Sequence, residues 1–389
     1  MKDEAEEPAS LQHDFIAHQH ANVFARAFSF AGDQLPTTSD KQIEVADWVL
    51  LIGEIGFIIQ LREREQQVAS RAGDLEKWVA SHVSRKGAKQ IQNTLHLLAS
   101  YVGLSLVNHF GHRVAIAATD PDEIVGVIVY RVPAKTRAFR AARFKRASNG
   151  TFVHILRDAD YFGISQRFVT PAELAGYFNF RRDILLGWDP PSTAVSETAL
   201  IGQYLLGDYS SPPDQGFERA ARSRGGPIAC EFSFILDSLA SRIAAQTEDS
   251  ADGECYEILT ELALLGRYEL QTLKQQIRLA LEAVRANRFE LPYRLASAQS
   301  DCGFLIVPVT REFQDRAFEA LDSLSLASKH ELDLERQVGI GMWKNSEFIH
   351  VEWVFLEGKN PPDPELDMRL ASSYPFRIAS ERRVRPVFT

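Results

Sequence analysis

The stretch from Asp47 to Arg64, DWVLLIGEIGFIIQLRER, narrows the folds open to this chain more than any other. Residues 45–52 and 57–61 are two aliphatic, β-branched runs, and the sequence Gly-Glu-Ile-Gly lies between them. Apolar runs separated by a short glycine-rich connection are typical of a β-hairpin. We therefore predict a hairpin over this stretch and place Glu54 and Ile55 at its turn.

Three polar side chains interrupt the apolar hairpin. With Glu54 and Ile55 at the turn, Asp47 lies opposite Arg62, and Gln60 lies two residues before Arg62 on the same strand. Because side chains alternate between the two faces of a strand, Asp47, Gln60 and Arg62 share one face. The pattern predicts that a carboxylate, an amide and a cation converge at the open end of the hairpin.

The spacing of Asp47, Gln60 and Arg62 resembles that of the PD-(D/E)XK nuclease superfamily, in a degenerate D…QxR form. In that superfamily an acid on one strand is followed by acid-x-Lys on the next, and Gln sometimes replaces the second acid. Residues 74–101 are typical of a helix, and residues 102–107 and 113–117 of strands, an order similar to the superfamily's α-β-β-β-α-β core. The resemblance covers roughly residues 10–130, about a third of the chain.

The resemblance implies an α/β (α+β) fold whose N-terminal domain is restriction-endonuclease-like, with a mixed sheet flanked by helices. It implies an enzyme that hydrolyses nucleic-acid phosphodiesters with Mg²⁺ or Mn²⁺. By the same resemblance Asp47 and Gln60 would bind the metal and Arg62 would clamp a phosphate. Lys86 or Lys89, on the helix after the hairpin, would support the transition state.

Two substitutions distinguish this chain from the superfamily pattern. Hard divalent cations prefer oxygen ligands, and carboxylates bind them best. Gln60 offers only a neutral amide oxygen, so metal binding would rest mainly on Asp47, with Glu44 or Asp14 as further candidates. An arginine stays protonated at any working pH, so Arg62 could bind a phosphate but could not act as a general base.

A basic run follows the predicted nuclease core. Residues 131–146, RVPAKTRAFRAARFKR, contain seven Lys or Arg and no acid, whereas the whole chain has a net charge of -9. Such a run can neutralise phosphates without reading sequence. It is equally typical of a solvated arm or a contact for an acidic partner. The predicted nucleic-acid-binding residues are Arg131, Lys135, Arg137, Arg140, Arg143, Lys145 and Arg146.

Composition limits the class of protein. The acidic, polar start MKDEAEEPAS does not resemble a secretory signal, and no apolar run approaches the roughly 18–20 residues of a membrane span. Cys230, Cys255 and Cys302 are widely spaced, which is typical of a reducing compartment and provides no zinc cluster. We therefore expect a cytoplasmic protein without a membrane partner.

The pattern of helices, strands and proline-rich loops predicts three regions. Residues 10–200 form the nuclease-like domain with its basic extension. After the proline-rich loop at 209–216, residues 217–360 form a C-terminal helical and α+β domain. Residues 361–389 are predicted to be an irregular basic tail containing Arg382, Arg383 and Arg385.

Three functions are compatible with these features. The first is a metal-dependent nuclease, of the kind that acts in DNA restriction, repair or anti-phage defence. The second is a catalytically inactive nuclease fold that binds nucleic acid or a partner protein, which the Gln60 and Arg62 substitutions favour. In the third, Asp47 and Arg62 form only a cross-strand ion pair in a structural or interaction protein.

Overall fold

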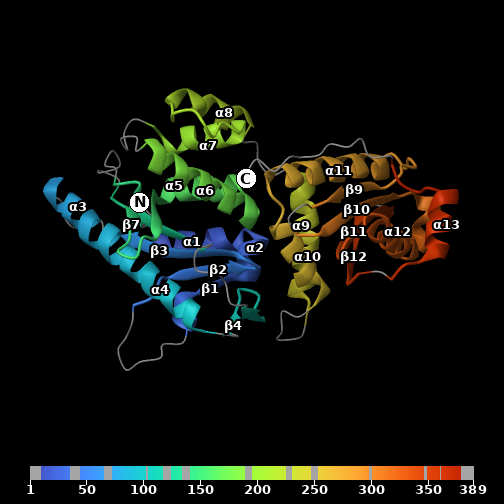
Figure 1. Cartoon of the computed structure of the whole chain (residues 1–389), viewed down its shortest axis with the longest axis horizontal. Helices are drawn as coiled ribbons and strands as arrows, with labels where there is room; N and C mark the ends of the chain where they lie inside the picture. Colours follow the sequence, from blue (N-terminus) through green and yellow to red (C-terminus); the bar gives the residue numbers. More distant parts are fainter. Residues whose placement is uncertain are drawn as a thin grey trace, which may run out of the picture. The chain divides into compact units, whose positions relative to one another are not determined.

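The computed structural model divides the chain into two compact units, residues 1–227 with 247–252 and residues 228–246 with 253–389. Each unit contains its own main β-sheet (Figure 1). The residues described are 10–35, 44–64, 72–101, 104–116, 124–133, 141–188, 195–224, 230–246, 253–297, 300–345, 348–359 and 361–377.

The N-terminal unit is built on a six-stranded mixed sheet with the strand order β1-β2-β3-β6-β8-β7. β1, β2 and β3 are antiparallel neighbours, β6 and β8 continue parallel to β3, and β7 is antiparallel to β8. The fold is therefore mixed α/β, as predicted. The strands are β1 (Ser29–Ala31), β2 (Trp48–Ile52), β3 (Ile55–Glu63), β6 (Ile124–Arg131), β7 (Phe144–Arg146) and β8 (Phe152–Arg157).

Helices cover both faces of this sheet (Figure 1). Between β3 and β6 the chain forms α3 (Ala72–Trp78), the π-helical η2 (Val79–Gly87) and α4 (Ala88–Ser100). Residues from these elements pack with Ile58, Ile128 and Val153 on one face of the sheet. On the other face, the ring of Phe178 in α6 lies 6.0 Å from that of Phe57 in β3.

The remaining elements of the N-terminal unit lie outside the main sheet and the helix between β3 and β6. The predicted strands at 102–107 and 113–117 correspond to β4 and β5, which form a separate two-stranded sheet rather than joining the main one. The elements are α1 (Leu11–His20), α2 (Val23–Phe28), η1 (Gly32–Gln34), β4 (Leu104–Val107), β5 (Arg113–Ile116), α5 (Asp158–Arg167), α6 (Pro171–Trp188), α7 (Glu197–Leu206), η5 (Gln215–Phe217) and α8 (Glu218–Arg224).

β2 and β3 form the predicted hairpin, but the predicted register is wrong by two residues. The turn is Gly53-Glu54, and Ile52 pairs with Ile55. Gly53 has a φ of +52°, which glycine adopts without steric cost, so it suits the first position of a two-residue hairpin turn. One step beyond the Trp48–Ile59 pair, Asp47 therefore lies opposite Gln60 rather than Arg62. A shift of two residues keeps the same face, so the predicted shared face stands.

The helix between β3 and β6 lies unusually close to the sheet. A Cβ on Gly87 would lie 2.9 Å from Cδ1 of Ile128, and a Cβ on Gly126 would lie 3.0 Å from Cγ2 of Ile91. Glycine at both contacts removes the side chains that would otherwise hold the backbones apart. Ile128 is paired with Gln60, so the π-helical segment is brought over the polar end of the hairpin.

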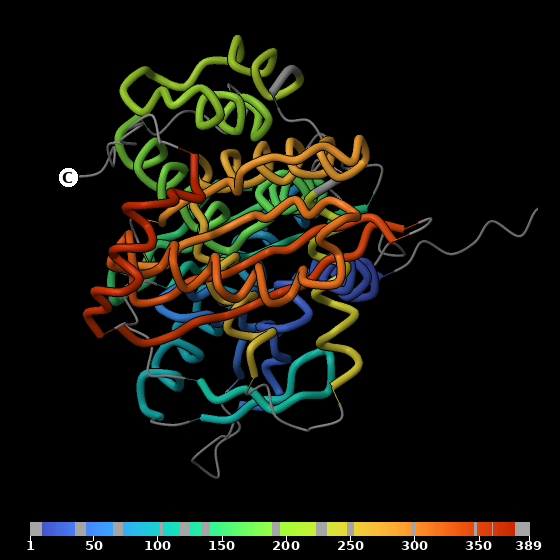
Figure 2. The backbone as a smooth tube through the Cα atoms, turned by 90° about the vertical axis from the view of Figure 1, so that its right-hand side faces the viewer, coloured from blue at the N-terminus to red at the C-terminus, as the bar shows by residue number. Residues whose placement is uncertain are grey.

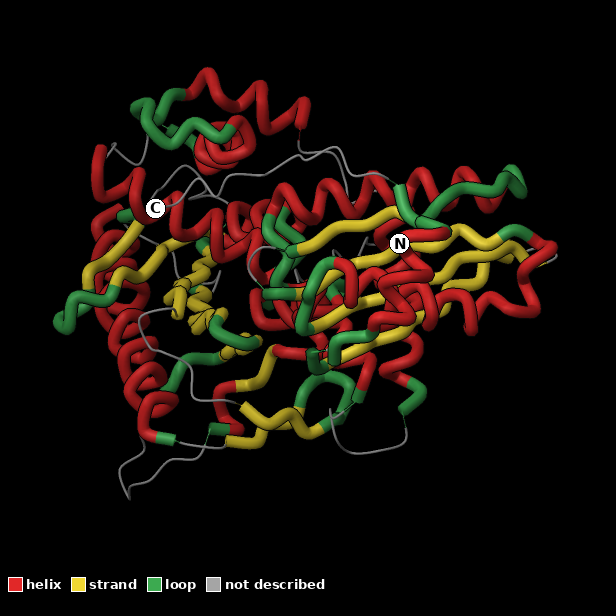
Figure 3. The backbone as a smooth tube through the Cα atoms, turned by 45° about the vertical axis from the view of Figure 1, so that its right-hand side comes forward, coloured by secondary structure: helices red, strands yellow, loops and turns green. Residues whose placement is uncertain are grey.

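The C-terminal unit has a four-stranded sheet with the order β12-β11-β10-β9 (Figures 2 and 3). β10 and β11 are parallel, and the other two pairs are antiparallel. α12 connects β10 to β11, and its Leu321 is buried with Leu305 and Val354 of the sheet. The elements are α9 (Cys230–Ala244), α10 (Glu254–Ala263), α11 (Arg267–Arg285), β9 (Tyr293–Ala296), β10 (Cys302–Val309), η6 (Arg311–Arg316), α12 (Ala317–Glu331), β11 (Arg336–Asn345), β12 (Phe348–Glu357) and α13 (Pro364–Ser372).

The predicted irregular tail begins with a helix, α13, so the prediction is wrong for residues 364–372. Asp363 caps this helix by accepting hydrogen bonds from the amides of Glu365 and Leu366, and proline at the first helical position fits the N-terminus. Arg382, Arg383 and Arg385 lie outside the described residues. In the parts of the chain that the structure describes, no helix has the length and apolar character needed to cross a membrane.

Candidate functional site

Asp47 and Gln60 meet at the open end of the hairpin, on the face covered by α3, η2 and α4. Oδ2 of Asp47 accepts a hydrogen bond from the Leu61 amide at 2.7 Å and another from Nε2 of Gln60. Gln60 is fully buried, and its Nε2 also donates to the Leu61 carbonyl oxygen at 3.1 Å. Its Oε1 is buried without a hydrogen-bond partner in the described structure. The site thus contains one unsatisfied oxygen beside a carboxylate.

Arg62 lies on the same face but points toward the π-helical segment. Its Nε donates to the carbonyl oxygen of His82 at 3.2 Å, and its Nη2 is buried without a partner among the described residues. Burial lowers the pKa of Arg62, and the nearby charges of Asp47 and Glu44 oppose that shift. A guanidinium remains charged despite such a shift, so Arg62 provides a fixed cation with a spare donor.

The carboxyl group of Asp47 is held in a partly dehydrated environment. Desolvation raises the pKa of Asp47, and the Leu61 amide, the charge of Arg62 and the amide of Gln60 oppose this rise. Removing water disfavours the charged carboxylate, whereas a bound divalent cation would favour it strongly. A cation bound beside Asp47 would therefore stabilise the charged form of its carboxyl group.

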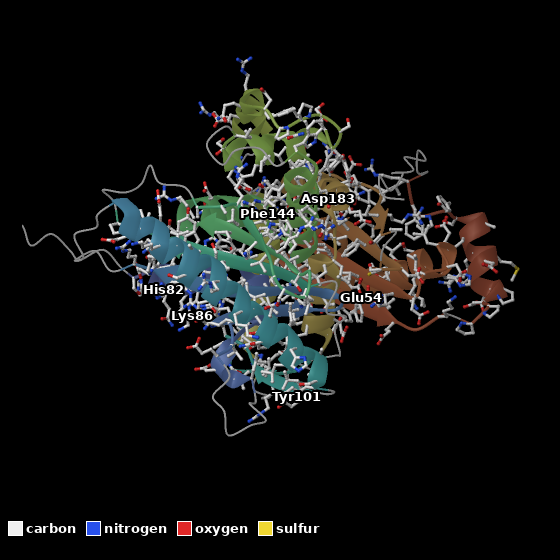
Figure 4. All side chains as sticks on the ribbon, turned by 60° about the vertical axis from the view of Figure 1, so that its left-hand side comes forward. Glu54, His82, Lys86, Tyr101, Phe144 and Asp183 are labelled. Atoms are coloured by element: carbon white, nitrogen blue, oxygen red, sulfur yellow. The ribbon has the colours of Figure 1, made fainter. Side chains whose placement is uncertain are left out.

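Glu44 and Lys86 border this cluster. Nζ of Lys86 lies 2.9 Å from Oε1 of Glu44, and both side chains are about half exposed, at 47% and 56%. Asn93, two turns further along the helix, donates to the backbone carbonyl of Glu44 at 2.9 Å. The flank of the helix containing Lys86 thus lies along the segment that leads into Asp47. Figure 4 shows Lys86 and His82 on this helix, apart from Glu54 at the hairpin turn.

Two predicted contributors are not brought to the cluster. Lys89 is exposed and has no described contact with Asp47, Gln60 or Arg62. Asp14 lies on the opposite face of the sheet, where its Oδ2 is 2.7 Å from Nη2 of Arg131. Its use as an additional metal ligand beside Asp47 is therefore wrong.

The predicted nucleic-acid-binding run does not form one basic surface in the described structure. Arg131 is ion-paired with Asp14 and with Asp158, the latter at 2.6 Å, and its side chain is 18% exposed. Arg143 donates to the Val195 carbonyl at 2.7 Å and lies near Glu197. Both arginines are thus used within the fold, by partners distant in sequence. Lys145 and Arg146 are exposed on β7, whereas Lys135, Arg137 and Arg140 lie outside the described residues.

The cluster can offer three oxygen atoms to a cation. Rotating the Gln60 amide by 180° exchanges the positions of its nitrogen and oxygen. Oε1 would then lie beside Asp47 Oδ2 and the Leu61 carbonyl, where three oxygens repel one another unless a cation lies between them. Mg²⁺ prefers oxygen ligands and is commonly bound through one or two carboxylates, and this set would offer it one carboxylate and two neutral oxygens. No cluster of three or more His, Cys, Asp or Glu among the described residues offers an alternative metal site.

Sequence reasoning missed the main-chain groups of Leu61. The amide of Leu61 fixes Asp47, and its carbonyl completes the oxygen set. A side-chain pattern cannot reveal these main-chain groups, which can bond to Asp47 and Gln60 because β3 extends beyond the end of β2.

A second polar cluster, buried around Arg181, was also missed. Arg181 is fully buried; its Nε lies 2.8 Å from Oε1 of Glu197 and its Nη2 3.1 Å from Oε2. The hydroxyl of Tyr177 donates to Glu197 Oε1 at 2.5 Å, and Arg181 Nη1 lies 2.9 Å from His154 Nδ1. Burial and Arg181 hold the pKa of His154 well below its usual range, so it stays neutral and accepts this bond. A cavity of about 60 Å³ adjoins the cluster.

Comparison of the chain with models of protein families, with curated proteins and with solved structures finds no match.

Proposed function

We propose that the N-terminal unit is a restriction-endonuclease-like nuclease that cleaves nucleic-acid phosphodiesters with a divalent cation bound at Asp47. The observation that carries the proposal is the convergence of Asp47 Oδ2, the Gln60 amide and the Leu61 carbonyl beside Arg62. The order of the elements supports the resemblance, because the strands of the main sheet and the helices α1 and α3–η2–α4 follow the expected α-β-β-β-α-β sequence once α2, η1 and the separate β4–β5 sheet are set aside.

Each residue has a defined role in this proposal. A cation held by Asp47, Gln60 and Leu61 would lower the pKa of a bound water and stabilise charge on the phosphate. Arg62 provides a permanently charged donor whose free Nη2 can bind a phosphate oxygen. Lys86 provides a second cation on the same side, exposed and within reach of Glu44. Without metal, Nε2 of Gln60 donates to Asp47; with metal bound, the turned amide would offer Oε1 to the cation instead.

A second function, binding of nucleic acid without cleavage, is favoured by the hydrogen bonds that fill the site. Nε2 of Gln60 occupies the place between Asp47 and the Leu61 carbonyl, which is where a cation would lie. If this amide is not displaced, the site is closed to metal and retains only the cations Arg62 and Lys86. Cleavage and metal binding distinguish the two functions.

Cleavage of labelled DNA and RNA with Mg²⁺ or Mn²⁺ tests the proposal. We expect the wild type to cut in a metal-dependent manner, Asp47→Ala to lose cutting and Arg62→Ala to be strongly impaired. Glu54→Ala is the matched control, because Glu54 is an exposed acid at the other end of the same hairpin. Absence of cutting by all four proteins, with nucleic-acid binding intact, would favour the binding function instead.

A further inference from the structure

The charged side chains of η2 and α4 are all basic. From Val79 to Ser100 the sequence contains three Lys or Arg, two His and no Asp or Glu. This stretch of η2 and α4 stands out in a chain whose net charge is -9. A strongly one-signed helix in an acidic protein indicates a surface for a polyanion rather than ordinary solvation.

The basic residues lie on more than one side of the helix. Val83, Ile91 and Leu95 are buried against the sheet. Lys86 lies on the flank near Asp47, where Glu44 neutralises it. Residues 85, 89, 92 and 96 recur at intervals of three or four and so form another stripe. Arg85 and Lys89 are exposed in this stripe and form no ion pair with any acid that the structure describes.

Strand β7 adds a further cation beside this stripe. Lys145 of β7 pairs with Val153 of β8, and Val153 and Ile91 both approach the position of a Cβ on Gly126, at 3.5 and 3.0 Å. Lys145 therefore lies on the same face of the sheet as α4. Nε2 of Gln92, within the stripe, lies 2.7 Å from Oδ1 of Asn149 in the turn between β7 and β8. β7 is the edge strand of the sheet, and Lys145 is exposed.

We propose that Arg85, Lys89 and Lys145, here named the α4–β7 surface, bind the phosphate backbone of nucleic acid next to the Asp47 site. The inference deepens the proposed function, since it assigns the surface that holds the substrate while Arg62 and Asp47 act on one phosphate. Arg85 and Lys89 are contributed by the same helix that places His82 against Arg62, so bound backbone would pass close to the site. The contacts are to phosphates, so the binding is independent of sequence.

Fluorescence anisotropy in EDTA tests this surface without metal or cleavage. Labelled single-stranded DNA, duplex DNA and RNA are titrated between 50 and 300 mM salt. The triple variant Arg85→Gln, Lys89→Gln and Lys145→Gln removes three phosphate contacts. We expect its log-log salt slope to be shallower than wild type by about 2 to 3 units, from about 0.7 to 0.9 per contact. The single-stranded and duplex arms show which form the surface accepts.

A matched control removes three positive charges elsewhere. Arg311→Gln, Arg316→Gln and Lys359→Gln change exposed residues of the C-terminal unit, and we expect wild-type binding and salt slope. An equal loss of nucleic-acid binding in both triple variants would contradict the assignment of the α4–β7 surface, because net charge alone would then explain the binding. Competition by poly-glutamate as strong as by DNA would also overturn it, in favour of an acidic protein partner.

The experiments give different results if the proposed α4–β7 surface is wrong and if the proposed nuclease activity is wrong. If the wild type cleaves and the triple variant binds and cleaves equally well, the α4–β7 surface is wrong and the nuclease stands. If no protein cleaves but the triple variant loses binding, the surface stands and the nuclease is wrong. If the wild type binds none of the three nucleic acids at 50 mM salt, the surface is overturned.

Discussion

The N-terminal unit contains two polar clusters of opposite character. Around Arg181, every nitrogen of the fully buried guanidinium has a partner and both oxygens of Glu197 are bonded, and among the described groups only Nη1 of the neighbouring Arg143 is buried without a partner. Around Asp47, by contrast, Gln60 Oε1 and Arg62 Nη2 are buried without partners in the described structure, and the carboxylate is partly dehydrated. Satisfied networks stabilise a fold, whereas unsatisfied groups beside a carboxylate indicate a place for a ligand. The difference supports our proposal that the Arg181 cluster is structural and that the Asp47 cluster is functional.

The largest expected effect is loss of stability when Arg181 is removed. Arg181→Ala leaves Glu197 buried without its main partner, and we expect unfolding to be easier by about 3–5 kcal/mol. Arg182→Ala is the matched control. Arg182 follows Arg181 on α6 and its side chain is 41% exposed, so its removal should lower the free energy of unfolding by less than about 0.5 kcal/mol. Urea denaturation measures both. A cost below about 1 kcal/mol for Arg181→Ala would remove the structural assignment.

A second carboxylate, introduced at position 60, should make the folding stability depend on bound metal. Gln60→Glu places a buried acid beside Asp47, and we expect a loss of about 1–3 kcal/mol without metal. Mg²⁺ or Mn²⁺ at a hundred times its dissociation constant should restore about 2.7 kcal/mol. Gln203→Glu is the matched control, since Gln203 is also fully buried with Oε1 unpartnered among the described residues. Equal rescue of both variants by metal would contradict the assigned site.

The contributions of the two clusters to folding stability should change with pH in opposite directions. The folded pKa of Asp47 is raised, so its contribution to stability is fully present below the unfolded pKa and is lost as pH rises through the folded one. The stability of Asp47→Asn relative to the wild type should therefore increase from about pH 4 upward. Arg181 and Arg143 lower the pKa of Glu197, so its contribution is lost as pH falls. The deficit of Glu197→Gln should accordingly shrink below about pH 4. Denaturation curves between pH 3 and 7 would show parallel behaviour if this distinction is wrong.

The smallest effects separate Lys86 from Lys89. An exposed ion pair contributes about 0–1 kcal/mol, so neither Lys86→Ala nor Lys89→Ala should alter stability much. We expect Lys86→Ala to lower kcat by about tenfold, the size of a lost charge contact of roughly 1.4 kcal/mol, and Lys89→Ala to raise KM at unchanged kcat. Steady-state cleavage kinetics measure both. A fall in kcat with Lys89→Ala alone would reverse the two assignments.

The hairpin and its polar face could be predicted because local sequence determines both. Two apolar runs around glycines define the strands, and the period of two places Asp47, Gln60 and Arg62 on one face. The register could not be predicted from the same signal, because moving the turn to Gly53-Glu54 preserves that alternation. The glycine requirement at the first turn position was the available clue.

Contacts between distant segments could not be predicted. Arg131 and Arg143 appear in the sequence as part of a basic run, yet Asp14, Asp158 and Glu197 neutralise or border them in the fold. A run of basic residues forms a basic surface only when no acid from a distant part of the chain pairs with it. Conversely, the sequence offered no reason to choose between Lys86 and Lys89, whereas the fold places an acid beside Lys86 alone.

Binding of Mn²⁺ measured by isothermal titration calorimetry tests the central claim most directly. We predict one site in the wild type, lost in Asp47→Ala, retained in Glu54→Ala and tightened in Gln60→Glu. Equal Mn²⁺ binding by wild type and Asp47→Ala, or no binding by the wild type, would contradict the assignment of a cation site to Asp47.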